Sequence, residues 1–131
     1  MLEELERWEE AEIEEMSKSS NDNSRKKLNQ LLIDTDILIT NFKNSSEKKL
    51  NLIPQELQKK FPGLIHGRIS GFGDNSDRIA YDLIIQAESG LMSINGNQTD
   101  LPTKLPIAFV DILAAHQLKE GILLSLLEKQ R

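Results

Sequence analysis

Apolar residues recur with a helical period in some parts of this chain and gather in short β-rich runs in others. The segment 25–33, RKKLNQLLI, places its leucines at helical spacing, which predicts a helix that Asn23 or Ser24 caps. The segment 36–40, DILIT, is short, rich in β-branched residues and bounded by polar ones, so it predicts a strand. A helix is therefore expected to lead directly into a strand.

Later segments repeat this alternation. The run LIHGRISGF at 64–72 predicts a second strand that leads into a loop with glycines, and the run 110–127 is apolar nearly all round, which is typical of a buried helix. A polar loop is expected at 17–24, a turn at 43–49, and a long loop or edge strand at 95–106. A short helix is expected at 53–61, with Pro54 in its first turn and Pro62 and Gly63 after it. Another helix is expected from about Asp77, with one apolar face formed by Ile79, Leu83, Ile84 and Ala87.

The order of these elements predicts the fold class. Helix, strand, helix, strand, helix, helix is the order of an α/β fold, with an open, mainly parallel sheet and flanking helices. Two strands do not make a stable open sheet by themselves. The sequence therefore predicts a partial sheet, that is, a piece of a larger domain.

Charge is distributed unevenly along the chain. The first sixteen residues carry eight Glu and one Arg, a charge of −7, whereas the whole chain carries −5, so the remainder carries +2. Residues 2–16 are also dense in strong helix formers and predict an acidic helix. A mildly positive remainder argues against bulk binding of nucleic acid but tolerates a multiply charged anion such as a nucleotide-like cofactor.

Composition limits the location and the chemistry. No apolar run approaches the roughly 20 residues of a membrane span, and the chain has no cysteine that could form a disulfide or a thiolate metal ligand. A cytoplasmic protein without a membrane partner is expected. His66 and His116 stand without Asp, Glu or His at ligand spacing, so structural roles are favoured for both and no metal is expected.

Asp82 and Asp111 are lone carboxylates in otherwise apolar runs. Asp111 lies between PIAFV and ILAA, at the start of the last predicted helix. There it is either the N-cap of that helix or a carboxylate at the edge of a dry pocket, able to act as nucleophile or base. For Asp82 the simple alternative is a polar residue on the outer face of a helix. The spacing alone does not decide either case.

Four ordered motifs in the stretch from about Leu28 to Arg131 resemble the class III CoA-transferases. This CaiB/BaiF family includes formyl-CoA transferase, carnitine CoA-transferase and the α-methylacyl-CoA racemases. The motifs are DILITNF with its Asn-Phe pair, LIHGRISGFG with its Ser-Gly-Phe-Gly turn, the Tyr-Asp helix with the Gly-Leu-Met-Ser segment and Pro-Thr-Lys loop that follow it, and FVDILAAH, which matches the helix of the catalytic aspartate. The resemblance implies that residues 24–131 are part of the family's Rossmann-like large domain. The acidic helix and linker at 1–23 have no counterpart in it.

The resemblance also implies roles for individual residues. Asp111 corresponds to the nucleophile that forms a mixed anhydride with the acyl group and then an aspartyl-CoA thioester, before a second carboxylic acid takes the CoA. The implied substrates are acyl-CoA and a carboxylic acid acceptor, and the implied assembly is a homo-oligomer, a dimer in the family. The residues implied to contact coenzyme A are Asn41, Phe42, Lys43, Gly71, Phe72, Gly73, Tyr81 and Asp82.

Two alternatives to CoA transfer remain at this point. The racemase branch has a His directly before the Asp that aligns with Asp82, whereas this chain has Tyr81, a poor general base at neutral pH. This difference favours transfer over racemisation. The other alternative is a non-catalytic scaffold or interaction domain. Because the resemblance covers only part of the family's length, the isolated chain is not expected to turn over.

Overall fold

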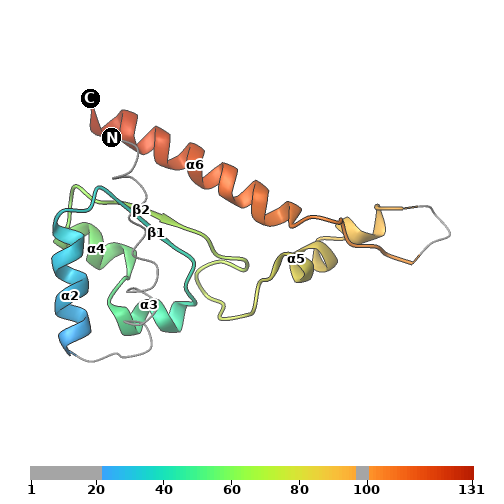
Figure 1. Cartoon of the computed structure of the whole chain (residues 1–131), viewed down its shortest axis with the longest axis horizontal. Coiled ribbons are helices and arrows are strands. Elements are labelled where there is room, and N and C mark those ends of the chain that lie inside the picture. The colour runs from blue at the N-terminus through green and yellow to red at the C-terminus, as the bar shows by residue number, and fades with distance from the viewer. Residues whose placement is uncertain (1–21, 97–100) are drawn as a thin grey trace. The chain divides into compact units, whose positions relative to one another are not determined.

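The computed structural model describes residues 22–96 and 101–131 (Figure 1). The helix expected at 2–16 lies outside this part of the chain. The described residues fall into two compact units, of which the first contains 22–38 and 45–64. The second contains 39–44 and the described residues from 65 onwards.

The first unit is built around leucines. Helix α2 (Asp22–Ile33), most of α3 (Asn44–Leu50), α4 (Pro54–Lys60) and the first half of strand β1 (Ile37–Thr40) belong to it. Its buried apolar side chains are Leu28, Leu32, Leu38, Leu50, Leu52 and Leu57. Since apolar area removed from water is the main favourable term in folding, these six residues form the core of the described part of the unit. The helix predicted at 53–61 and the strand predicted at 36–40 are confirmed by α4 and β1.

Two predictions in the first unit are wrong. Helix α2 begins at Asp22, so Asn23 and Ser24 lie inside it instead of capping it. Polar residues are tolerated there because the first N–H groups of a helix have no intrahelical acceptor.

The turn predicted at 43–49 is the helix α3. Its polar residues were interpreted as a turn, but Leu50 at its end is buried. The helix terminates where Asn51 adopts a positive φ of 57°, and the N–H of Leu52 donates to the Glu47 carbonyl at 2.9 Å. This 6→1 bond is the Schellman end of a helix. The buried leucine and this terminus stabilise a helix that local composition does not indicate.

The second unit contains a short parallel pairing and a long helix. Strand β2 (Ile65–Arg68) is the neighbour of β1, and the N–H of Ile69 donates to the Thr40 carbonyl at 3.0 Å. Helix α5 (Asp82–Glu88), the 3-10 turn η1 (Leu91–Ser93) and helix α6 (Phe109–Lys129) follow. The expected α/β class with a parallel sheet is confirmed. No helix in the described part of the chain has the length and apolar character that a membrane span requires.

Helix α6 packs along β2 (Figure 1). Gly67 in the middle of β2 makes this approach possible, because a Cβ there would lie 2.8 Å from Leu118 Cδ1 and 3.2 Å from Ile122 Cδ1. The missing side chain lets the helix lie close to the strand.

Two boundaries predicted in the second unit need correction. Strand β2 ends at Arg68 instead of residue 72, since β1 ends at Thr40 and offers no further pairing partner. Helix α5 begins at Asp82 instead of about Asp77, and Ile79, expected on its apolar face, is 51% exposed in the irregular segment before it. In the loop expected at 95–106, the described residues 95–96 and 101–106 form no strand.

The prediction that the last helix is buried is also wrong. No side chain of α6 is buried, and Leu123, Leu124 and Leu127 are 52%, 62% and 60% exposed. Leu113 is likewise 48% exposed, while Ile122 and Leu126 are half-buried. Among the described elements, β2 and α5 contact this helix but leave many of its apolar side chains exposed.

Candidate functional site

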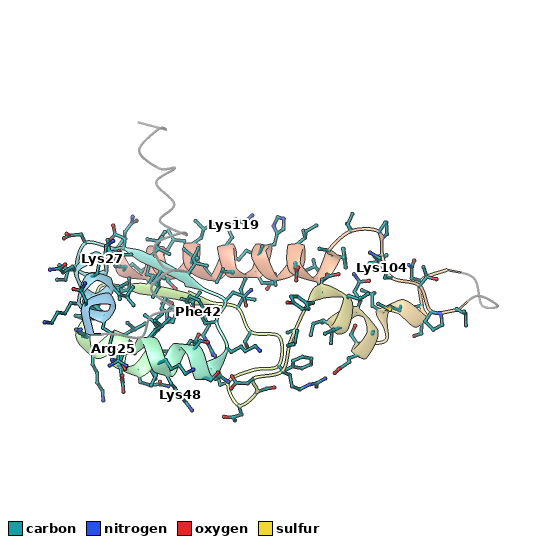
Figure 2. The ribbon with its side chains drawn as sticks, turned by 60° about the horizontal axis from the view of Figure 1, so that its bottom comes forward. Arg25, Lys27, Phe42, Lys48, Lys104 and Lys119 are labelled. Carbon is teal, nitrogen blue, oxygen red and sulfur yellow. The ribbon has the colours of Figure 1, made fainter. Side chains whose placement is uncertain are left out.

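A cavity of about 260 Å³ opens where β1 and β2 end. It is lined by the segments 41–44 and 68–72 and by Ser76 and residues 78–81. Phe42, labelled in Figure 2, follows β1 almost directly and belongs to the first segment. Ligands of open α/β sheets bind outside the carboxyl ends of the strands, and this cavity has that position.

Six of the nine residues predicted for the site line this cavity: Asn41, Phe42, Lys43, Gly71, Phe72 and Tyr81. Gly73, Asp82 and Asp111 lie outside its lining. The structure therefore brings together the two segments that the resemblance assigned to coenzyme A. The binding roles themselves stay predictions.

A hydrogen-bond network of Arg68, Asn44 and Asp74 holds the loop that follows β2 in place. The Arg68 guanidinium donates hydrogen bonds to the Asn44 side-chain oxygen and to the Asp74 carboxylate. The Asn44 amide in turn donates to the backbone carbonyls of Asp74 at 2.5 Å and Ser76 at 3.1 Å. Because Arg68 ends β2 and Asn44 follows β1, this network ties the loop after β2 to the ends of both strands.

Arg78 covers the aromatic ring of Phe72. Its guanidinium carbon lies 3.9 Å from the ring centroid, within the range of a cation–π interaction, and it also forms an ion pair with Glu88. The planar group is therefore held by both a ring and a carboxylate.

The charges around the cavity favour an anion. Lys43, Arg68 and Arg78 line it, and no Asp or Glu of the described residues does. The two arginines share their charge with Asp74 and Glu88, whereas Lys43 has no hydrogen-bond or ion-pair partner among the residues that the structure describes. Lys43 is thus a cation available to a bound anion.

The close approach of Ala80 requires glycine at position 71. A Cβ on Gly71 would lie 1.9 Å from the Cβ of Ala80, which is far inside van der Waals contact. The loop after β2 and the segment before α5 can approach each other this closely only with glycine at position 71.

Asp111 is not the N-cap of α6, so that interpretation is wrong. Ala108 occupies the N-cap position and has no side-chain oxygen, and Asp111 lies in the first turn. The acceptor comes from another helix: Asp82 Oδ1 accepts the backbone N–H of Val110 at 2.7 Å and of Asp111 at 3.3 Å. The carboxylate of Asp111 itself has no hydrogen-bond or ion-pair partner among the described residues, and the residue is exposed.

Gln86 connects Asp82 with the segment that enters α6. It is only 1% exposed, and its amide donates to Asp82 Oδ2 at 2.5 Å and to the Ile107 carbonyl at 3.3 Å. Its side-chain oxygen accepts the N–H of Leu105 at 2.9 Å. The interpretation of Asp82 as a polar residue on an outer helix face is therefore wrong, because both of its oxygens accept hydrogen bonds from the protein.

Sequence reasoning missed four side chains that shape the site: Asn44, Arg68, Arg78 and Gln86. Two signals were available for them. Arg68 is a cation at the carboxyl end of a predicted strand, and Gln86 follows Asp82 by four residues, so both lie on the same helix face. Asn44 carried no comparable signal, since its partners lie 24 to 32 residues away. Arg78 carried none either, because Glu88 is ten residues away and Phe72 lies before the segment that leads into α5.

The two histidines have local partners. His66 Nε2 lies 2.9 Å from Thr40 Oγ1, and His116 Nδ1 lies 3.3 Å from Lys119 Nζ on α6. Within residues 22–96 and 101–131, no three His, Asp or Glu side chains are close enough to hold a metal ion together. A second and more open cavity of about 520 Å³ lies between β2 and α6, lined by residues 65–70 and by one face of α6.

Comparison with known proteins supplies the relatives of this chain. The sequence model of CoA-transferase family III matches residues 19–131. The chain is 31% identical over 104 residues to the probable fatty acyl-CoA transferase Rv3272 of Mycobacterium tuberculosis, which covers 76% of this chain and 26% of that protein. It is 37% identical over 86 residues to the succinate–glutarate CoA-transferase of Agrobacterium fabrum, covering 63% and 22%.

The fold agrees with these matches. The orthorhombic crystal structure of Rv3272 superposes with a TM-score of 0.76 and 26% identity, over 86% of this chain and 32% of that one. The chain thus spans about a quarter of the length of the curated relatives it matches.

Proposed function

Because this chain belongs to CoA-transferase family III, we propose that it carries the nucleophile and part of the coenzyme A surface of an enzyme that transfers CoA between carboxylic acids. One observation carries the proposal. The carboxylate of Asp111 is exposed and unpartnered among the described residues, while its backbone N–H is held by Asp82. A carboxylate that forms no hydrogen bond of its own is available for covalent chemistry.

In the proposed reaction, the Asp111 carboxylate attacks the acyl carbonyl of an acyl-CoA, which forms a mixed anhydride and releases the CoA thiolate. The thiolate attacks the aspartyl carbonyl, releases the donor carboxylate and leaves an aspartyl-CoA thioester. The acceptor carboxylate attacks this thioester, forms a second anhydride and releases the thiolate again. Attack of the thiolate on the acceptor carbonyl gives the new acyl-CoA and restores Asp111. Division into these steps lowers the barrier of a difficult exchange.

The basic cavity is the proposed surface for coenzyme A. Lys43 would neutralise a phosphate, and Asn41, Phe42, Gly71, Phe72 and Tyr81 line the same cavity. At about 260 Å³, the cavity lies below the roughly 300–1,000 Å³ of typical ligand pockets. It therefore fits a part of coenzyme A and not the whole cofactor.

For the isolated chain, we propose only the steps up to the aspartyl-CoA thioester. The chain spans about a quarter of its relatives, and contacts to the acyl group and the acceptor lie outside the residues assigned here. We expect covalent capture of CoA by Asp111 without sustained turnover by the isolated chain. The substrates proposed are acyl-CoA and a carboxylic acid in the cytoplasm.

A mass measurement tests this first prediction. The chain is incubated with succinyl-CoA, a probe chosen because the Agrobacterium fabrum relative is a succinate–glutarate CoA-transferase, and its intact mass is recorded. A CoA adduct is expected in the parent and in Glu120→Gln, which removes an exposed carboxylate from the same helix. No adduct is expected in Asp111→Asn. An adduct that survives in Asp111→Asn, or no adduct in the parent, contradicts the proposal.

Racemisation is less well supported. The racemase branch of the family has a His at the position of Tyr81, and this chain lacks that imidazole base. The Tyr81 side chain is 72% exposed, and its hydroxyl has no hydrogen-bond partner among the described residues. Exchange of the C2 hydrogen of a 2-methylacyl-CoA in heavy water would reveal that activity.

A further inference from the structure

The N-terminus of α6 is completed by a helix distant in the sequence. The first four N–H groups of a helix need acceptors from outside its regular pattern. In α6, Phe109 donates to the Ile107 carbonyl at 2.9 Å, and Ile112 makes the first regular helical bond, to the Ala108 carbonyl at 3.1 Å. The two N–H groups between them, of Val110 and Asp111, both donate to Asp82 Oδ1. One carboxylate therefore accepts two of the four N–H groups that the regular pattern leaves without an acceptor.

Gln86 extends this connection to the segment before α6. Asp82 and Gln86 lie one turn apart on α5, and they are joined by the 2.5 Å bond between Gln86 Nε2 and Asp82 Oδ2. Gln86 also binds the backbone of Leu105 and Ile107. Two side chains of α5 thus bind the backbone at four points, from Leu105, four residues before α6, to Asp111, the third residue of α6.

This arrangement separates two tasks that an aspartate at a helix start usually combines. An acid in the first turn can stabilise that turn through its own side chain. In α6 the acceptor is Asp82, and the carboxylate of Asp111 makes no bond to its own helix. The backbone of Asp111 is held while its side chain stays unengaged.

We propose that Asp82, braced by Gln86, is a positioning residue that fixes the first turn of α6 and so presents the Asp111 carboxylate for reaction. The inference rests on the proposed role of Asp111 as nucleophile. It assigns to Asp82 an action through the protein backbone instead of a contact with the cofactor. Catalytic groups need such support, because small displacements of a reacting group lower the rate strongly.

Two variants of Asp82 test the proposal in the full chain. Asp82→Ala removes the acceptor, whereas Asp82→Asn retains an oxygen that can accept the same N–H groups. Hydrogen exchange of the Val110 and Asp111 amides, followed by NMR, is expected to accelerate roughly tenfold in Asp82→Ala, as for loss of a helix cap. It is expected to change much less in Asp82→Asn and not at all in Glu120→Gln.

The second readout separates positioning from stability and from cofactor binding. In Asp82→Ala, the rate of adduct formation with succinyl-CoA is expected to fall at least tenfold, while the Kd for CoA changes less than about twofold, because the cavity does not include Asp82. Asp82→Asn is expected to recover most of the rate. A residue with only a structural role would lower binding and rate together.

Each contrary result has a distinct meaning. Parental amide exchange in Asp82→Ala, or a parental adduct rate, overturns the positioning role and leaves Asp111 as nucleophile. A loss of CoA affinity with unchanged amide exchange assigns Asp82 to the cofactor surface and also overturns it. If the parent forms no adduct at all, the proposed function fails, and the catalytic role of Asp82 fails with it.

Discussion

The three cations of the cavity differ in how firmly the protein holds them. Arg68 is bound by Asn44 and Asp74, and its side chain is only 15% exposed. Arg78 lies on Phe72 and pairs with Glu88, whereas Lys43 is unpartnered among the described residues. The arginines therefore shape the cavity, and Lys43 is the group whose charge a ligand can use.

Replacing Lys43 is expected to weaken CoA binding without changing the cavity. An exposed ion pair with a phosphate contributes little, so Lys43→Ala should raise the Kd about two- to fivefold, and the difference should shrink at high salt. Titration of CoA followed by backbone amide NMR shifts measures this. Lys119→Ala is the matched control, because Lys119 projects from the side of α6 away from β2 (Figure 2). Equal effects of the two variants would indicate binding without a defined site.

At the residue scale, the sequence predicted which residues lie at the cavity better than it predicted their hydrogen-bond partners. Asn41 to Lys43 and the turn at Gly71 carry motifs that can be recognised in a single chain, and these residues line one cavity. Asp82 was expected beside the cofactor, but its hydrogen bonds join it to residues 28 and 29 positions further along the chain. Local spacing cannot indicate a partner at that separation.

At the scale of elements, the approach of the loop after β2 to the segment before α5 depends on Gly71. In Gly71→Ala the new methyl group would meet the Ala80 Cβ, which cannot rotate away, at 1.9 Å. We expect a loss of about 2–3 kcal/mol in the free energy of unfolding, in the upper range for overpacking, together with loss of CoA binding. Urea unfolding and CoA titration measure the two effects.

A reciprocal change controls this prediction. Ala80→Gly removes the methyl group that the new side chain meets, so the double variant should recover most of the lost stability. Gly121→Ala makes the same substitution inside α6, where no atom lies within 4 Å of the new Cβ. It should stabilise the chain by up to about 1 kcal/mol through helix propensity. Unchanged stability in Gly71→Ala would show that the loop moves freely.

The elements that were predicted wrongly share one cause. Helix α3 forms in a polar segment because buried Leu50 and the Schellman end at Asn51 stabilise it. Helix α5 begins late because the preceding segment lines the cavity against Gly71 instead of continuing the helical pattern. In α3 the burial of Leu50 and the conformation of Asn51 decided the helix, and in α5 a contact with a preceding loop decided the boundary, so polarity and periodicity alone indicated neither.

At the scale of the whole molecule, α6 presents apolar surface. Leu123, Leu124 and Leu127 are more than half exposed and lie within its last two turns. Exposed apolar surface of this kind marks an interaction region. The homo-oligomer expected from the sequence stays a prediction, and this surface is where we expect contact.

Substitution on this surface tests the expectation. The parent chain should associate with increasing concentration in sedimentation velocity, and the double variant Leu124→Gln, Leu127→Gln should shift it towards the monomer, since less apolar area is then removed from water on contact. Ile33→Gln, at the end of α2 in the first unit, removes an exposed apolar side chain from another helix and should have no effect. Association that is identical in all three chains would place the contact elsewhere.

The sequence by itself determined the family and the α/β order of elements, because short motifs and hydrophobic periodicity are local properties of a chain. It also identified Asp111 as a lone carboxylate in an apolar run. Only the tertiary structure decided that Asp82 accepts the first N–H groups of α6, that Arg68 ties the loop after β2 to both strands, and that α6 stays largely exposed. These features depend on contacts between residues far apart in sequence, and such contacts exist only when the chain is folded.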